Sequence, residues 1–220
     1  MLRGIMSDTL IITEIYASIQ GESSYAGLPC TFVRLTGCPL RCRWCDTTYG
    51  FYGGTETSLS DIMANVKNLG VSLVELTGGE PLAQKNCPSL AKVLIDEGYK
   101  VLIETGGSED VSPLDKEVHI IMDIKCPGSQ MHEKNRWENL NHLKPTDEIK
   151  MVLADRADFE WAVIKMKEHR LTERFKVLLS PAFGLLKPKD LAEWIVAEKL
   201  DVRLNLQQHK YIWHPRAKGV

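Results

Sequence analysis

The sequence lacks any run of about 18 consecutive apolar residues, which excludes a membrane-spanning helix. Residues 1–8 lack the apolar core of a secretory signal peptide, so we do not expect export. An excess of one charge is also missing, because 27 basic and 29 acidic side chains leave a net charge of −2. A chain so balanced has no overall electrostatic basis for binding nucleic acid. We therefore expect a cytoplasmic protein that binds neither membranes nor nucleic acid.

Internal repeats and low-complexity tracts are missing from the sequence as well. The 220 residues, 44% apolar and 25% charged, suffice for one sizeable core, so we predict a single domain over residues 1–220. Without a secretory signal, the six cysteines are expected to be reduced thiols. Cys30, Cys87 and Cys126 stand alone in the sequence, and such a free cysteine commonly packs as a small apolar side chain.

The other three cysteines, Cys38, Cys42 and Cys45, fall within eight residues in the pattern C-x3-C-x2-C. Three thiolates on one loop can converge on a soft metal centre, either zinc or an iron–sulfur cluster. Arg41 and Arg43 between them are expected to favour the thiolate form. A closed zinc site needs a fourth ligand, and the sequence has no second C-x2-C or H-x3-H pair. A four-iron cluster held by three cysteines leaves one iron open to a small molecule, so the triad favours catalysis over scaffolding.

The rest of the chain alternates between strand and helix patterns. Before the cysteine loop, strands are predicted at residues 10–16 and 30–36. After a flexible connection at 49–57, strands are predicted at 71–76, 100–104, 118–124, 148–153, 175–180 and 201–206. Helices are predicted at about 58–68 and at 88–97, 156–169 and 189–199, with 129–143 as the weakest helix.

Such alternation implies right-handed βαβ units and a mainly parallel sheet. About six strand–helix units are too few for a full eightfold barrel, so we predict an α/β fold built as an incomplete (β/α) barrel. Barrel-like folds carry their working residues at the carboxyl ends of the strands. The distinctive residues of this chain follow the predicted strands in that way and are expected to share one rim: Cys38, Thr77, Glu104, Asp123, Lys125, Ser180 and the segment 207–209.

The cysteine triad resembles the signature of the radical S-adenosylmethionine (SAM) superfamily, in which the methionine moiety of SAM chelates the open iron. Further motifs resemble the family of 7-carboxy-7-deazaguanine synthases, enzymes of the queuosine pathway. These motifs are Gln20-Gly21-Glu22, Arg34, Cys45-Asp46-Thr47, Thr77-Gly78-Gly79-Glu80-Pro81 and Gln208-His209-Lys210-Tyr211. The resemblance runs from about Ile12 to about Trp213, which is nearly the whole chain.

The resemblance implies a [4Fe–4S] cluster on the triad, bound SAM, and Mg²⁺ near Thr47. The residues that it implies for SAM are Trp44, Cys45, Asp46, Gly78, Gly79, Glu80, Glu104, Cys126-Pro127-Gly128 and Ser180-Pro181-Ala182-Phe183. Several of these residues also have ordinary structural explanations. The segment 77–81 could be a plain strand-to-helix turn, the two proline segments could be loops only, and Glu104 could be a solvated carboxylate instead of a contact to the ribose.

The family's substrate, 6-carboxy-5,6,7,8-tetrahydropterin, carries a carboxylate. Arg34 lies within an otherwise apolar strand, where a buried charge is costly without a partner, and its planar guanidinium suits that carboxylate. The alternative is an Arg–carboxylate pair within the protein. Gln20 and Glu22 offer donor and acceptor groups to the amide and amino edge of the pterin. The other residues that the resemblance implies for substrate are Ile19, Gly21, Thr77, His209 and Pro215.

Three polar residues and one proline have weaker claims to a role in substrate binding. Asp123 and Lys125 are interpreted as an ion pair with each other that has no further role. Lys150 is interpreted as a solvated charge on a strand. Pro215 stands where the family's chain end approaches the substrate, whereas five more residues follow it in this sequence.

The family resemblance also implies the reaction. The reduced cluster gives one electron to SAM, and the resulting 5′-deoxyadenosyl radical takes a hydrogen atom from C6 of the pterin. The substrate radical contracts its ring, recovers a hydrogen atom and loses ammonia, which yields 7-carboxy-7-deazaguanine and regenerates SAM. The protein orients and shields these species. An electron donor that the sequence does not identify and a homodimer are further expectations.

Two other interpretations remain open at this stage. A small radical SAM activating enzyme, which installs a glycyl radical on a partner protein, would share the triad but would not need Arg34 or Gln208-His209. A binding module stapled by zinc would need no cosubstrate.

Overall fold

The computed structural model describes residues 8–220, so most of the segment on which the signal-peptide prediction rests lies outside the described residues. The strands are β1 (Thr9–Ile19), β2 (Pro29–Leu35), β3 (Thr55–Ser58), β4 (Leu73–Gly78), β5 (Lys100–Thr105), β6 (His119–Asp123), β7 (Glu148–Leu153), β8 (Lys176–Pro181) and β9 (Arg203–Leu204). The α-helices are α1 (Leu59–Leu69), α2 (Cys87–Asp96), α3 (Arg156–Glu168), α4 (Leu171–Arg174), α5 (Pro188–Ala197) and α6 (His209–Ile212). Among the described helices, none is long and apolar enough to cross a membrane.

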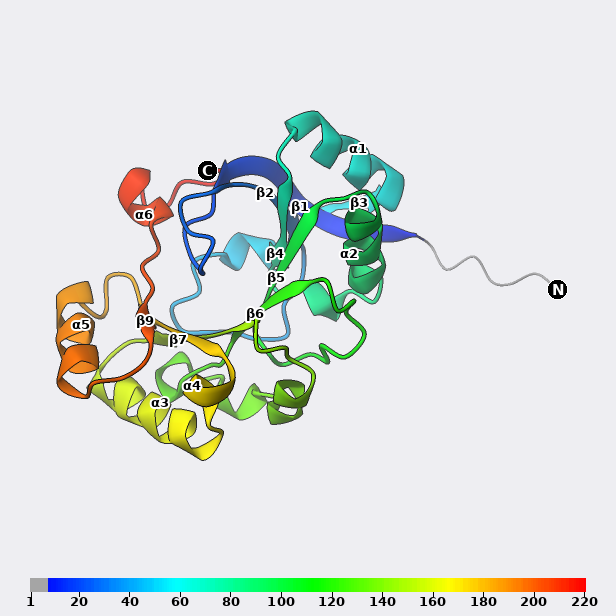
Figure 1. Ribbon diagram of the computed structural model, residues 1–220. Coiled ribbons are helices and arrows are strands. Elements are labelled where there is room, and N and C mark those ends of the chain that lie inside the picture. Colours follow the sequence, from blue (N-terminus) through cyan, green and yellow to red (C-terminus); the bar gives the residue numbers. More distant parts are fainter. Residues whose placement is uncertain (1–7) are drawn as a thin grey trace.

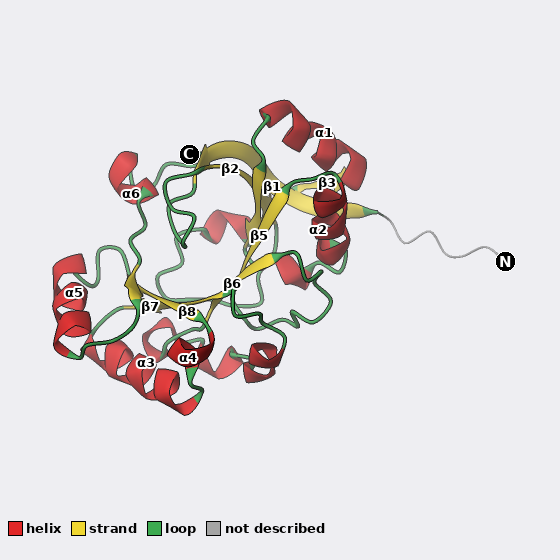
Figure 2. Cartoon of the chain, in the orientation of Figure 1, coloured by secondary structure: helices red, strands yellow, loops and turns green. Residues whose placement is uncertain are grey.

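The described strands form one sheet in the order β3-β1-β2-β4-β5-β6-β7-β8-β9. Every neighbouring pair from β2 to β9 is parallel, whereas β1 runs antiparallel to both β2 and β3. The sheet curls around an interior with the helices on its outer side, and α6 lies in the gap between β9 and β2 (Figures 1 and 2). The prediction of a mainly parallel, incomplete barrel is therefore confirmed.

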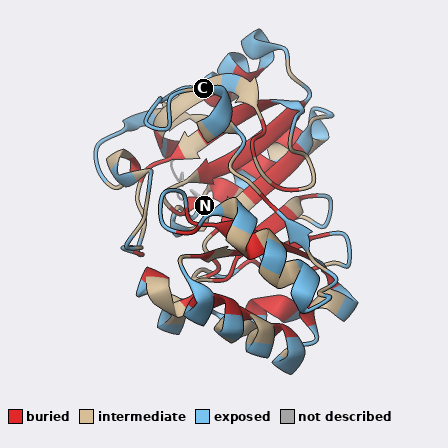
Figure 3. Ribbon diagram, turned by 90° about the vertical axis from the view of Figure 1, so that its left-hand side faces the viewer, coloured by how far each residue is buried: buried red, intermediate tan, exposed pale blue. Residues whose placement is uncertain are grey.

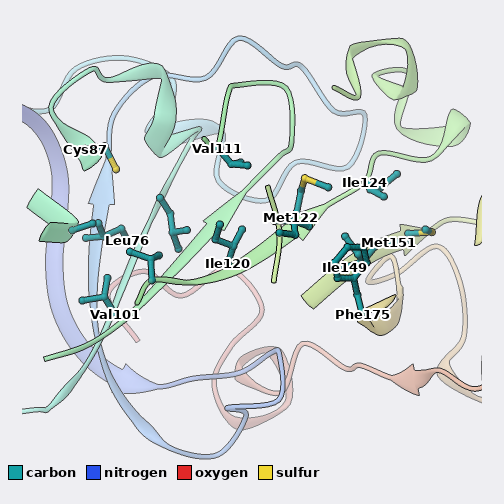
Figure 4. Packing of buried hydrophobic residues seen from close by; sticks show 14 of the residues in the cluster. Leu76, Cys87, Val101, Val111, Ile120, Met122, Ile124, Ile149, Met151 and Phe175 are labelled. Atoms are coloured by element: carbon teal, nitrogen blue, oxygen red, sulfur yellow. The ribbon is translucent and has the colours of Figure 1, made fainter. Parts of the chain in front are cut away.

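Successive side chains of each strand point alternately outward and inward. The outward residues belong to the main hydrophobic core under the helices, and Figure 4 shows Leu76, Val101, Ile120 and Ile149 among them. The strands are largely buried, whereas the helices expose their outer faces (Figure 3). The inward residues form a small apolar cluster of Cys30, Phe32, Leu73, Leu102 and Ile121.

Inward positions closer to the carboxyl ends of the strands carry polar side chains. They include Arg34, Glu75, Thr77, Glu104, Asp123, Lys150 and Ser180. The interior of the barrel is thus polar at the carboxyl ends of the strands and has an apolar layer below, whereas His119 and Glu148 lie at the amino ends of β6 and β7. The polar end is where a charged ligand can bind without displacing the core.

Local sequence signals explain where the first helix begins and ends. The Ser58 hydroxyl accepts a hydrogen bond from the Asp61 amide at 3.1 Å and so caps the first turn of α1. Gly70 ends α1 with φ of 69°, a left-handed conformation that glycine adopts at little cost.

The weakest predicted helix, residues 129–143, is wrong. The described chain there has two short 3₁₀ helices, His132–Lys134 and Trp137–Asn141, after a third at Pro127–Ser129. The side chain of Asn135 bonds both the amide and the carbonyl of Lys125, and Asn139 bonds the carbonyl of Glu109. Such side chain–backbone bonds compete with helix formation.

Two strand predictions also needed correction. The predicted final strand at 201–206 shrinks to the two residues of β9, and the connection predicted at 49–57 contains most of β3. The short helices α4 and α6 were not predicted.

Candidate active site

A cavity of about 800 Å³ lies at the polar end of the barrel. Its walls come from the cysteine loop, the ends of the central strands, residues 19–22 and the chain after β9. It takes in most of the predicted site: Ile19, Gln20, Gly21, Glu22, Arg34, Cys38, Cys42, Trp44, Cys45, Asp46, Thr47, Thr77, Gly78, Gly79, Glu104, Ala182, Phe183, His209 and Pro215. Of the residues expected to share this rim, Ser180 and Gln208 do not line the cavity, and the others do.

The three clustered cysteines are free, partly buried thiols on one wall of this cavity. Burial raises the pKa of each thiol, and the Lys125 ammonium at the end of β6 opposes that rise. Arg41 acts mainly on the backbone, because it donates to the carbonyl of Cys38 at 2.6 Å and lies over the ring of Phe51. Arg41 also opposes the rise in the pKa of Cys45, so the prediction for Arg41 holds at that thiol, while Lys125 acts on all three.

The chemistry of these donors fits an iron–sulfur cluster. Within residues 8–220, no three Cys, His, Asp or Glu side chains converge closely enough to hold a single metal ion. A cluster does not require that convergence, because each thiolate binds a different iron. Cys38, Cys42 and Cys45 would hold three irons and leave the fourth without a protein thiolate.

Gly78 and Gly79 let the end of β4 pack against the start of the cysteine loop. A Cβ on Gly78 would lie 2.3 Å from the carbonyl oxygen of Leu35, and one on Gly79 would lie 2.3 Å from that of Gly37. The Glu80 amide also donates to the Gly37 carbonyl at 2.7 Å. The glycine pair therefore positions the cluster loop, while its contact with SAM stays a prediction.

Glu80 is wholly buried and lies behind the cavity wall. Its carboxylate accepts hydrogen bonds from the Leu82 amide (3.0 Å), the Thr105 hydroxyl (2.9 Å) and the Gly106 amide (2.6 Å). Burial raises the pKa of Glu80 to about 7 despite these bonds. The geometry shows a structural role, and the predicted contact of Glu80 with SAM stays a prediction.

Glu80→Ala is expected to lower the free energy of unfolding by roughly 2–4 kcal/mol, because it leaves buried donors without an acceptor. Urea unfolding of the two proteins measures this difference. Glu80→Gln keeps an acceptor oxygen and should lose less than half as much. An alanine variant as stable as the parent would show that the three bonds contribute nothing to stability.

Lys150, interpreted from the sequence as a solvated charge, is buried inside the barrel. Its ammonium lies 2.6 Å from Glu22 Oε2 and bonds Glu104 Oε1. The solvated interpretation is therefore wrong for Lys150, and Glu104 is a paired carboxylate. Lys125 and Asp123 do pair with each other, at 2.8 Å, as predicted.

Arg34 has partners inside the protein. Its Nε donates to Glu14 Oε1 at 2.7 Å, and a terminal nitrogen donates to the Tyr16 hydroxyl at 3.1 Å. The alternative of an internal ion pair is thus present in the structure. The guanidinium nevertheless lines the cavity and has further N–H groups, so its contact with a substrate carboxylate stays a prediction.

The segment 20–22 meets the C-terminal part of the chain inside the cavity. Gln20 donates to the buried carboxyl of Glu75, and the Gln208 amide donates to the Gly21 carbonyl at 2.9 Å. A Cβ on Gly21 would lie 2.5 Å from His209 Nδ1, so only glycine lets His209 come this close. Burial lowers the pKa of His209, which favours a neutral imidazole at the cavity wall.

Asp46 and Thr47 form a small polar group beside the last cysteine. Burial alone would raise the pKa of Asp46, but the adjacent Lys210 ammonium and the Thr47 hydroxyl lower it to about 2. The Thr47 hydroxyl donates to Asp46 Oδ1 at 3.0 Å, and Gln207 approaches Asp46 Oδ2 at 3.4 Å. The chain after β9 is thus tied to the cysteine loop.

The two predicted proline loops have different positions. Cys126, Pro127 and Gly128 lie outside the cavity lining. The Gly128 amide donates a hydrogen bond to Asp158. The turn that follows supports the cysteine loop, because the Arg43 amide donates to the Ser129 carbonyl. In the second loop, Ala182 and Phe183 line the cavity. Pro181 lines a neighbouring small pocket, and the buried Ser180 accepts a hydrogen bond from Asn205 at 2.8 Å. Contacts of both loops with SAM stay predictions.

Pro215 and the residues after it, 216–220, also line the cavity. The ammonium of Lys218 lies 4.2 Å from the centre of the Tyr49 ring, which also lines the cavity. The extra residues thus leave Pro215 at the cavity. Its contact with substrate remains a prediction.

Sequence reasoning missed several polar residues of the cavity, among them Tyr16, Tyr49 and Glu75. Lys125 and Gln207 were expected on the rim, and Lys210 belongs to a family motif, but none of the three was given a role in the site. Glu75 is two residues before Thr77 and therefore shares its face of β4, a signal that could have revealed it. Lys150 gave no such signal, because Glu148 and Lys150 alternate with Ile149 and Met151 as they would on a strand that faces solvent.

Comparison with known proteins agrees with this geometry. A family model described as the radical SAM superfamily matches residues 32–128. The sequence is 48% identical to a 7-carboxy-7-deazaguanine synthase of Koribacter versatilis (strain Ellin345), over 95% of this chain and 99% of that protein. It is 45% identical to a 7-carboxy-7-deazaguanine synthase of Chlorobaculum tepidum, over 96% of this chain and 97% of that protein.

The crystal structure of QueE from Escherichia coli has the same fold, with a TM-score of 0.76 over 91% of this chain and 95% of that chain, at 23% identity. The sequence relatives match along nearly their whole length, and the cavity gathers the motifs that suggested their family. The chain therefore belongs to the family of 7-carboxy-7-deazaguanine synthases, within the radical SAM superfamily.

Proposed function

We infer that this chain is a radical SAM lyase that converts 6-carboxy-5,6,7,8-tetrahydropterin to 7-carboxy-7-deazaguanine and ammonia in queuosine biosynthesis. One observation supports this function in addition to the family membership. The cysteine triad, a guanidinium and a set of buried carboxylates line one cavity of about 800 Å³. A metal-stapled binding module would not need such a cavity, and a glycyl-radical activating enzyme would not need its polar interior.

When bound at the triad, the cluster and SAM supply a 5′-deoxyadenosyl radical for hydrogen-atom transfer. The residues of the chain bind and orient the reactants. Arg34 would bind the substrate carboxylate, and Gln20 and Glu22 would bind the amide and amino edge of the pterin. The C-terminal segment with His209 and Pro215 lines the same cavity and would exclude water from it.

Anaerobic product analysis tests this function. Reconstituted protein, incubated with SAM, a reductant and the carboxypterin, should form 7-carboxy-7-deazaguanine, identified by mass spectrometry. Intact substrate beside a protein with full iron content would refute the proposal. Zinc in place of iron after reconstitution, without a charge-transfer spectrum, would support the binding module instead.

We also propose that residues 1–220 act as one domain, with an electron donor that is still to be identified. The continuous sheet through the described residues supports the single domain. A homodimer is the expectation from the family, and sedimentation analysis of the reconstituted protein would test it.

The Mg²⁺ prediction concerns Thr47. Magnesium takes oxygen ligands and often binds through few protein groups together with the substrate. The Thr47 hydroxyl lines the cavity and is held by Asp46, so it could complete such a site once substrate supplies further oxygens. Turnover should therefore rise with Mg²⁺, and Thr47→Ala should weaken that dependence while leaving the iron content unchanged.

Thr47→Ser is the matched control, because it keeps the oxygen and should keep the response to Mg²⁺. Equal turnover with and without Mg²⁺ in the parent enzyme would rule the ion out. If turnover of the Thr47→Ala variant rises with Mg²⁺ as much as that of the parent, Thr47 is not a ligand of the ion.

A further inference from the structure

Lys150 projects from β7 into the interior of the barrel, where its side chain is only 5% exposed. It bonds two carboxylates that come from different parts of the fold. Glu22 lies in the loop after β1, which Figure 1 shows inside the ring of strands, and Glu104 lies near the end of β5. Lys150 thus connects the loop after β1 to the end of β5.

The charges around this ammonium explain why it is needed. Two carboxylates so close together would repel each other, and burial raises the pKa of Glu104. Burial alone would lower the pKa of Lys150, but Glu104 and Glu22 hold it well above its ordinary value. Lys150 therefore stays charged, and its bonds favour the ionised form of Glu22, whose pKa is lowered in spite of burial.

The neighbouring Glu75 behaves differently. Burial and the charge of Glu104 raise the pKa of Glu75 well above its ordinary value, which favours a neutral carboxyl. Lys150 bonds Glu22 and Glu104 directly, whereas Glu75 accepts its hydrogen bond from Gln20. Glu22 and Glu104 therefore present their carboxylates side by side around one ammonium.

The bonds to Lys150 do not use up the hydrogen-bonding capacity of its partners. A carboxylate offers about four acceptor sites, and Lys150 takes one oxygen of each acid. Both acids line the cavity, and the side chain of Glu104 is 26% exposed. Gln207 and Asn205 approach Glu22 at 3.1 and 3.4 Å, so this acid is held from two sides. The remaining acceptor sites can take N–H groups of a ligand.

We propose that Lys150 is a positioning residue, which holds Glu22 and Glu104 as paired acceptors for the N–H groups of the substrate heterocycle. This proposal rests on the proposed function, because a tetrahydropterin supplies several N–H donors. Lys150 acts through its partners. Its removal should therefore weaken substrate binding more than it slows the reaction of substrate that is already bound.

The test uses reconstituted full-length enzyme and the variant Lys150→Met. We expect KM for the carboxypterin to rise about 10- to 100-fold, as loss of a charge-assisted bond allows, while kcat falls about threefold or less. The single variant should also unfold at a lower temperature, because two buried carboxylates lose their counter-charge. The double variant Lys150→Met, Glu104→Gln should regain much of the lost unfolding temperature, while its KM should stay raised.

Lys144→Met is the matched control. Lys144 also pairs with a buried acid, Asp147, at 2.9 Å, but both lie outside the cavity lining. This control should lose stability and keep KM within about twofold of the parent value. If the Lys150 single variant does not fold, the double variant alone decides the matter.

A folded Lys150 variant, single or double, with KM within about twofold of a productive parent overturns the proposal. A fall in kcat with KM unchanged overturns it as well, because that result indicates general damage. A parent enzyme that forms no product from the carboxypterin would instead refute the proposed function, and with it this inference.

Discussion

Replacing Cys38, Cys42 or Cys45 by Ala is expected to abolish SAM cleavage. Each thiol would hold one iron of the cluster, and the three line the same wall of the cavity. Loss of one ligand exposes an iron that needs a soft donor, so the cluster should be lost or incomplete. Iron content after anaerobic reconstitution and the yield of 5′-deoxyadenosine measure the two consequences.

The other cysteines provide matched controls, because Cys30, Cys87 and Cys126 are wholly buried away from the cavity lining. Cys30→Ala, Cys87→Ala and Cys126→Ser should each keep the iron and the cleavage activity. A triad variant with full iron content and undiminished 5′-deoxyadenosine formation would disprove the assignment of the cluster.

Arg34→Ala is expected to lose substrate binding while the cluster and SAM binding remain. Loss of a bidentate charged pair with the substrate carboxylate should cost about 2–5 kcal/mol, or about 30- to 5,000-fold in Kd. Anaerobic titration of the SAM-loaded enzyme with the carboxypterin measures this change.

The internal partner of Arg34 requires a control of its own. Arg34→Ala also leaves Glu14 without its guanidinium, which could disturb the fold locally. The double variant Arg34→Ala, Glu14→Gln removes that unpaired charge and should recover stability without recovering affinity. Unchanged affinity in either folded variant would mean that Arg34 serves only the ion pair with Glu14.

Elements with a local cause were predictable from the sequence. The cap at Ser58 and the glycine at Gly70 define α1, and the predicted strands from 71 to 180 are present within a few residues. The cysteine loop lies at the end of β2, where the pattern placed it. These features depend on neighbouring residues and on the periodicity of the chain.

The polar interior was harder to predict, because alternation of polar and apolar residues also describes a strand that faces solvent. Glu148 and Lys150 alternate with Ile149 and Met151, yet Lys150 is buried because the loop after β1 brings Glu22 to it. No local signal shows that a distant loop enters the barrel. The helix prediction for 129–143 is wrong for a similar reason, because asparagine side chains in this segment bond backbone groups of other segments.

The stoichiometry of turnover tests the central claim most directly. Conversion of the carboxypterin to 7-carboxy-7-deazaguanine and ammonia changes no net oxidation state, so SAM should be regenerated and not consumed. We predict many equivalents of product and of ammonia, in equal amounts, for each equivalent of SAM lost. Absence of the product, or consumption of one SAM for each product formed, would contradict this account.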